Sequence, residues 1–246
     1  MDVNALLRIR TKFIRDFYTE TSSSFAERIR KIEAEEEPFQ PPVVDEYSVP
    51  DEPPFFSEWY DAKESLNVLG QMCISMLSSA LQLYLKECIN ELHRRYGTEA
   101  LAKFGIGWPD ENKAAFNKKG WINGYRVFFR DKLRIDWNNA PSDLKLLEEI
   151  VLARNNIQHP ARIDRLSAQH WEYDPKEYPR SFFADENEMK MIAADPLHGS
   201  GDPLSGDPLF LWRLDISKDK LWQAIDEVEK FCEWLDRVEG SVSQRT

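Results

Sequence analysis

The sequence predicts an all-α fold, a helical bundle with a long irregular insertion and at most one short strand. Apolar side chains recur every three or four residues over most of the chain, which is the period of an amphipathic helix. The one candidate strand is FLWRLDI at 210–216. The apolar fraction of 42%, in a chain of 246 residues, is enough for a sizeable core. We therefore expect residues 1–246 to form a single helical domain.

The N-terminal segment is predicted to be a helix at 3–32 followed by a linker. Apolar residues follow helical spacing at Leu6, Ile9, Phe13 and Phe17, and again at Phe25, Ile29 and Ile32. The Arg and Lys residues between them would form the solvated face, and a helix lying on a membrane surface is the alternative. Residues 33–54 are acidic and contain six prolines, which exclude a long helix or a central strand. We expect a linker there.

Residues 57–96 are predicted to form the long central helix of the bundle. Apolar residues hold the helical period throughout and widen in the middle, so this part should be buried on nearly all sides. Ser57 is the expected N-cap, and Gly97 should end the helix. Cys73 and Cys88 are expected in the core, and His93 is expected to be solvated or to cap the helix end.

Residues 113–134 combine the densest positive charge of the chain with aromatic side chains. The cations are Lys113, Lys118, Lys119, Arg126, Arg130, Lys132 and Arg134, interleaved with Trp121, Tyr125, Phe128 and Phe129. Bases stack on aromatic rings and phosphates pair with cations, so this composition suits single-stranded RNA. The candidate RNA-binding residues here are Lys118, Lys119, Arg126 and Arg130. The alternative is an amphipathic helix with its aromatics inward and its cations outward, and that cation face could still line a cleft.

Another amphipathic helix is predicted at 142–159, and it carries a cation in its apolar stripe. Leu147, Ile150 and Val151 form that stripe, whereas Glu148 and Glu149 fall on the far side. Arg154 lies within the stripe, where a buried charge without a partner would be strongly destabilising. We therefore expect Arg154 to be paired, or to face a wet cleft or an interface.

The same helix should end at His159, because Pro160 follows it. Proline disfavours the α region for the preceding residue and removes a helical hydrogen bond. The imidazole is then free to turn toward Arg154. The partial negative charge of a helix C-terminus favours a protonated or donating histidine at this position.

The string Arg154-Asn155-Asn156-Ile157-Gln158-His159 resembles the R-x(4–6)-H motif of HEPN-domain proteins. The polar residue directly after the arginine fits that family too. HEPN proteins are helical and usually dimeric, and many are metal-independent endoribonucleases in toxin–antitoxin, phage-defence and RNA-processing systems. Some family toxins carry a tyrosine two residues after the histidine, which a partner enzyme modifies. This chain has Ala161 there, so that mode of neutralisation does not carry over.

The resemblance implies roles for three residues, with no cofactor. His159 would be the general base on a ribose 2′-OH or the acid on the leaving 5′-oxygen, and Arg154 would stabilise charge on the scissile phosphate. Asn155 would orient the arginine. The product would be a 2′,3′-cyclic phosphate. Two copies would meet through the 142–159 helix in a homodimer with one composite cleft, and an antitoxin or regulatory protein is a possible partner.

Two further inferences concern the RNA cleft. The connection between the 113–134 and 142–159 helices is short, so these helices are expected to be antiparallel neighbours. Arg162 and Arg165, just after the motif, are candidate phosphate contacts. In the alternative interpretation Arg154 pairs with a core carboxylate and His159 caps the helix. The chain would then be a non-catalytic helical RNA-binding or protein-interaction module, or an acidic antitoxin or immunity protein that binds a basic partner.

The C-terminal part is predicted to contain an irregular insertion and one more helix. Residues 167–209 contain DPL three times at uneven spacing, which is not a solenoid repeat. Residues 217–239 form a clear helix, with Ser217 as the expected N-cap and Gly240 as the stop.

The composition narrows the function classes and the compartment. A net charge of −11 argues against a general nucleic-acid coat protein. Three widely spaced cysteines give neither a disulfide framework nor a zinc pattern, which favours a reducing, cytoplasmic compartment. The N-terminal residues lack the apolar core of a signal peptide. The sequence contains no run of 18 uncharged apolar residues, so no membrane span is predicted.

Overall fold

The computed structural model describes residues 2–41, 52–111, 121–159, 182–185, 190 and 213–242. The described part is all-α, as predicted, and contains no β-sheet. Its helices are α1 (Val3–Glu33), α2 (Phe56–Tyr96), α3 (Thr98–Lys103), α5 (Trp121–Leu133), the short 3₁₀ helix η1 (Trp137–Asn139), α6 (Leu144–Gln158) and α8 (Lys218–Val242).

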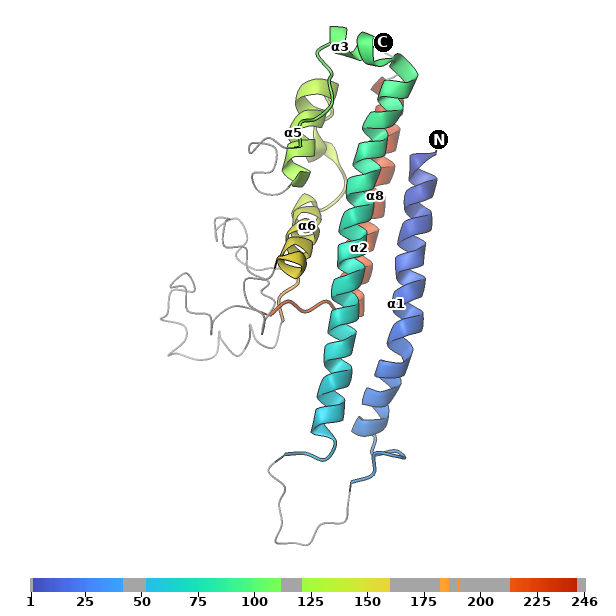
Figure 1. The fold of residues 1–246 in the computed structure, drawn as a ribbon, viewed down its shortest axis with the longest axis vertical. Helices are drawn as coiled ribbons and strands as arrows, with labels where there is room; N and C mark the ends of the chain where they lie inside the picture. Colours follow the sequence, from blue (N-terminus) through green and yellow to red (C-terminus); the bar gives the residue numbers. More distant parts are fainter. Residues whose placement is uncertain are drawn as a thin grey trace, which may run out of the picture.

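α2 is the central helix of the bundle. It contacts α1, α3, α6 and α8, and α1 and α6 each contact α8 as well. In Figure 1, α1, α2 and α8 run along the long axis, and α5 and α6 lie beside α2 on the side away from α1. This arrangement confirms the central position that the sequence predicts for the longest helix.

The buried face of α1 differs from the one that its apolar spacing suggests. Leu7, Ile14 and Tyr18 are buried, whereas Leu6, Ile9 and Phe13 are 45%, 65% and 55% exposed. α1 carries two apolar stripes, one that begins at Leu6 and one that begins at Leu7. Because successive residues are about 100° apart on a helix, the two stripes face different directions. α2 and α8 cover the stripe that begins at residue 7 and leave the other one open.

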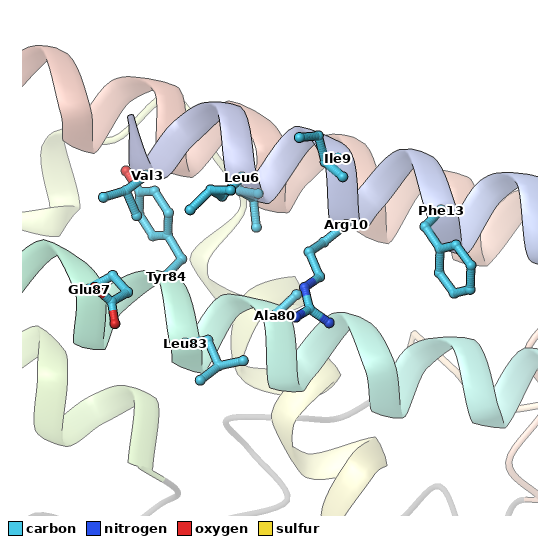
Figure 2. A pocket seen from close by; sticks show the side chains of 10 residues that line it. Val3, Leu6, Ile9, Arg10, Phe13, Ala80, Leu83, Tyr84 and Glu87 are labelled. Carbon is cyan, nitrogen blue, oxygen red and sulfur yellow. The ribbon is translucent and has the colours of Figure 1, made fainter. Parts of the chain in front are cut away.

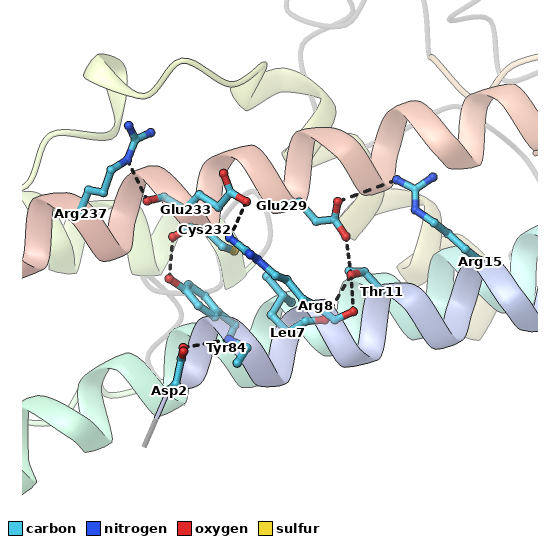
Figure 3. A network of polar contacts seen from close by, with 11 residues as sticks. Asp2, Leu7, Arg8, Thr11, Arg15, Tyr84, Glu229, Cys232, Glu233 and Arg237 are labelled. Atoms are coloured by element: carbon cyan, nitrogen blue, oxygen red, sulfur yellow. Dashed lines mark hydrogen bonds and ion pairs between the residues drawn. The ribbon is translucent and has the colours of Figure 1, made fainter.

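Cations and a hydroxyl on α1 fasten this helix to α8 (Figure 3). The buried Thr11 hydroxyl donates to the carboxylate of Glu229. Arg15 lies 3.9 Å from the second oxygen of Glu229, and Arg8 pairs with Glu233 at 2.9 Å. Part of the predicted solvated face is therefore a polar seam between the first and the last helix.

The C-terminal end of α2 is as predicted, and its N-terminal end is not. Gly97 ends the helix with φ of +76°, a conformation that glycine adopts without strain. At the other end, the helix begins at Phe56 after Phe55 in the left-handed region, with no side-chain cap. The predicted Ser57 cap is wrong because the N-cap position is Phe55, two residues earlier.

His93, near the end of α2, is buried rather than solvated. Its side chain is 7% exposed and stacks on Trp108, with the ring centroids 4.0 Å apart. Trp108 belongs to the segment after α3, and its ring covers the ring of His93. The expectation of a solvated or capping role is therefore wrong.

α2 is also apolar along much of its length. Among the described residues it is the one helix long and apolar enough to cross a membrane, by length and composition, and 61% of its most apolar window is buried inside the fold. That burial is the pattern of a core helix.

The segment before α8 crosses α2 at close range. The buried Asn67 side chain donates to Leu214 O at 3.0 Å and accepts from Ile216 N at 3.1 Å. Leu214 also forms an isolated antiparallel bridge with Ala184. In the described part of 210–216, this bridge takes the place of the short strand considered in the sequence analysis.

The predicted start and apolar stripe of α8 are confirmed, but the helix extends beyond its predicted C-terminal end. The Ser217 hydroxyl accepts from Lys220 N at 3.4 Å, so Ser217 caps the helix. The buried stripe comprises Leu221, Ile225, Val228, Cys232 and Leu235. The helix continues to Val242, so the predicted stop at Gly240 is wrong.

The linker and the insertion are described only in part. α1 ends at Glu33, where the predicted linker begins, and residues 42–51 lie outside the described residues. Of the predicted insertion at 167–209, only 182–185 and 190 are described. Phe183 and Ala184 are both buried, so this piece packs on the bundle.

The three cysteines are expected to resist thiol reagents until the protein unfolds. Cys73, Cys88 and Cys232 form no disulfide and are buried. Burial raises the pKa of Cys73 to about 12 and that of Cys232 well above its ordinary value, and the thiolate is the reactive form. Titration with Ellman's reagent at mildly alkaline pH should detect almost no thiol in the native protein and all three in guanidinium chloride. Rapid reaction of the native protein would contradict this burial.

Candidate functional site

α6 is anchored firmly before it reaches the motif. Its N-cap is Asp143, whose carboxylate accepts from the backbone N–H groups of Lys145 and Leu146 at 2.9 and 3.2 Å. Every residue from 146 to 153 is buried, and the helix contacts α2, α5 and α8. The motif therefore begins where a rigid, buried helix emerges from the bundle.

Glu148 and Glu149 are buried, which corrects the prediction that they face away from the core. Their exposures are 9% and 6%. Glu148 lies 3.6 Å from the guanidinium of Arg126 on α5, and Glu149 accepts from Phe182 N at 2.5 Å. The far side of α6 is covered by α5 and by the 182–185 segment, so both carboxylates serve internal contacts.

Arg154 lies at the point where α6 leaves the core. It is half-buried, and its Nη1 donates to Asn155 Oδ1 at 3.0 Å. Within the described part of the chain, no carboxylate lies in ion-pair range of this guanidinium. The expected pairing with a core carboxylate is thus not found there, and an amide oxygen holds the cation instead.

His159 is exposed, one residue beyond the end of α6. Its backbone N–H donates to Asn155 O at 2.8 Å, and the helix ends at Gln158 as the following proline predicts. Asn155 therefore contacts both other motif residues, through its side chain and through its main chain. Pro160, Ala161, Arg162 and Arg165 lie outside the described residues.

The described cations of α5 are engaged in different ways. Arg126 donates to Asn138 Oδ1 at 2.5 Å and faces Glu148, so it links α5, η1 and α6. Arg130 is exposed and pairs with Asp131 at 2.7 Å. This hydrogen bond holds the pKa of the Asp131 carboxyl below its usual value. Lys113, Lys118 and Lys119 lie outside the described residues.

Three of the four aromatic side chains of α5 are buried in the core, and Phe128 is partly buried against it. Tyr125 and Phe129 are fully buried, and Trp121 is nearly so. Buried rings offer no face to a base, so this helix follows the alternative of inward aromatics and outward cations. α5 and α6 do contact each other, as their short connection predicts.

The partners of Arg126 could not be anticipated from the sequence. Asn138 belongs to the short 3₁₀ helix η1, which the apolar periodicity of the sequence does not predict. Glu148 lies where helical projection alone suggests solvent. Their role becomes visible only when α5 is packed against α6.

The last turn of α6 carries a half-buried guanidinium that is hydrogen-bonded to an amide, and the residue after the helix is a histidine that is exposed to solvent. A guanidinium can bind a phosphodiester, and an imidazole can exchange a proton with a hydroxyl group or a leaving oxygen next to that phosphate. In the described ranges, no three His, Cys, Asp or Glu side chains gather as a possible metal-ligand set.

The chain was also compared with known proteins. No protein-family model, no curated protein sequence and no solved structure matches it.

Proposed function

We propose that this chain is a HEPN-like endoribonuclease that cleaves RNA without a metal ion, by attack of a ribose 2′-OH on the adjacent phosphate. The observation that carries the proposal is the hydrogen bond between Arg154 and Asn155 at the open end of α6, next to the exposed His159. The resemblance to the R-x(4–6)-H motif supports the same residues.

Arg154 is the phosphate-binding group in this proposal. A guanidinium donates two parallel hydrogen bonds to phosphate oxygens, and charge grows on these oxygens in the transition state. The Asn155 amide already fixes one edge of the guanidinium. Less side-chain entropy is then lost when RNA binds.

His159 is the proton-transfer group. Histidine takes up and releases protons near neutral pH, and a positioned acid or base contributes roughly 10²- to 10⁴-fold to the rate. The exposed side chain is accessible to a 2′-OH or to a leaving 5′-oxygen. The buried part of α6 keeps the backbone of this end in place.

The biological setting follows the resemblance. A toxin–antitoxin or phage-defence role is proposed, with an antitoxin or regulatory protein as partner. The expected homodimer through residues 142–159 assumed an apolar stripe that continues into a partner. In the structure Leu147, Ile150 and Val151 are buried within their own chain, so only the last turn of α6 is left to contact a second copy.

The test is RNA cleavage by purified protein in excess EDTA, with wild type compared with His159→Ala and Arg154→Ala. We expect the wild type to cleave and both variants to lose activity by about 10²-fold or more. Gln158→Ala, which changes an exposed neighbour in the same helical turn, is the matched control and should keep wild-type activity. Circular dichroism should show that all variants are folded.

The second candidate is a non-catalytic helical RNA-binding or protein-interaction module. It is favoured by the burial of residues 146–153 of α6 inside one chain, which is how a structural helix would be placed. A wild type that binds RNA without cleaving it, with weaker binding by Arg154→Ala, would support this candidate. Loss of cleavage in EDTA, restored by added divalent metal, would contradict the metal-independent mechanism.

A further inference from the structure

The α1–α2 pair exposes more large apolar side chains than any other described part of the molecule. On α1 these are Leu6, Ile9 and Phe13, and on α2 they include Val68, Met72 and Leu83. Each set follows helical spacing, and each helix already buries a different stripe in the core. The pair therefore has a second apolar face that nothing in the described chain covers.

A groove of about 680 Å³ runs along this face between the two helices. Figure 2 shows Val3 and Leu6 on one wall and Leu83 and Tyr84 on the other, with Phe13 further along. Water-soluble monomers rarely expose apolar patches of this kind unless they bind something.

Two opposite charges lie at different points along the groove (Figure 2). Arg10 reaches from α1 toward Ala80 on α2, and Glu87 lies nearer the end that Val3 marks. Among the described residues, no carboxylate pairs with Arg10. Glu87 accepts from Asn90 at 3.0 Å and from Arg94 at 3.2 Å and is still partly exposed. The groove thus carries an unpaired cation at one position and an anion at another.

We infer that a second copy of this chain occupies the groove in a two-fold symmetric dimer. An isologous interface must be complementary to itself. A rotation about an axis between Arg10 and Glu87 brings Arg10 of each copy to the partner's Glu87. The apolar stripes of the two helix pairs then face each other, and the four helices close into a bundle.

This dimer interface goes beyond the proposed function and is different from the expected contact through residues 142–159. α6 packs on α2 and α8, and the groove lies between α1 and α2. The open end of α6 with Arg154 and His159 is not a part of the groove. Ribonuclease activity and dimerisation through the groove can therefore succeed or fail separately.

The test is sedimentation velocity of the full chain at micromolar concentration. We expect wild type to sediment as a dimer. Arg10→Glu and Glu87→Arg should each weaken the dimer by at least about tenfold, because each places like charges at both ends of the contact. An equimolar mixture of the two variants should dimerise again, since both contacts then join opposite charges. A pair within one chain would not be rescued by mixing.

Leu83→Glu is the second variant, because it places a charge in the apolar centre of the groove. It should abolish the dimer, and mixing with either charge variant should not restore it. A wild type that stays monomeric at all concentrations would overturn the inference, as would a dimer that none of the variants affects. A monomer that co-sediments with phosphatidylcholine–phosphatidylserine vesicles would also overturn it and would assign the face to a membrane surface.

Discussion

Replacement of Gly70 by alanine is expected to lower the free energy of unfolding by about 2–3 kcal/mol. A Cβ at this position would lie 2.2 Å from Ile216 O and 2.9 Å from Ile216 Cβ. The carbonyl belongs to the backbone and cannot rotate away, and the Asn67 side chain holds the segment just before it through Leu214 O and Ile216 N. The crossing segment must therefore move away from α2, which opens the core beneath it.

The measurement is equilibrium urea denaturation followed by circular dichroism. Gly107→Ala is the matched control, because a Cβ there has no atom within 4 Å. This control should stay within about 0.5 kcal/mol of wild type, as is usual for exposed positions. If Gly70→Ala is as stable as the control, the segment at 213–216 does not lie against α2 as described.

Replacement of Asn155 by aspartate is expected to reduce RNA cleavage by about 10²- to 10³-fold, which rests on the proposed function. Aspartate keeps an oxygen beside Arg154 but adds a negative charge. That charge would neutralise the guanidinium and repel the phosphate. Asn155→Ala only removes the hydrogen bond at 3.0 Å and should cost about tenfold.

Steady-state kinetics in EDTA would separate these effects. Asn155→Asp should raise KM and lower kcat together, because substrate and transition state both lose the cation. Gln158→Ala again serves as the control. If Asn155→Asp cleaves at the wild-type rate while His159→Ala is inactive, Arg154 does not act through its contact with Asn155.

Helix positions followed from the sequence because periodicity and chain breakers are local signals. The predicted 3–32 and 57–96 helices correspond to Val3–Glu33 and Phe56–Tyr96, and the proline after His159 marks the end of α6 correctly. The three motif residues could be selected for the same reason, since a cation in an apolar stripe and a histidine before proline are visible in one dimension.

Burial was harder to predict where a helix has neighbours on several sides. Glu148 and Glu149 looked solvated because projection assumes one buried face, whereas α6 is enclosed by α2, α5 and α8. α1 presented the opposite difficulty. It has two apolar stripes, and only the packing of α2 and α8 decides that Leu7 is buried and Leu6 is open. Such choices depend on tertiary contacts that no short window of sequence contains.

The seam between α1 and α8 has a consequence for synthesis on the ribosome. Thr11 and Glu229 are 218 residues apart in sequence. At typical translation rates of about 5–20 residues per second, α1 waits roughly 10 to 40 s for α8 to be made. During that time the nascent α1–α2 hairpin exposes the stripe destined for α8 in addition to its open groove. A ribosome stalled before α8 would therefore present a hairpin with exposed apolar surface. Ribosome-associated chaperones should bind that intermediate and release the finished chain.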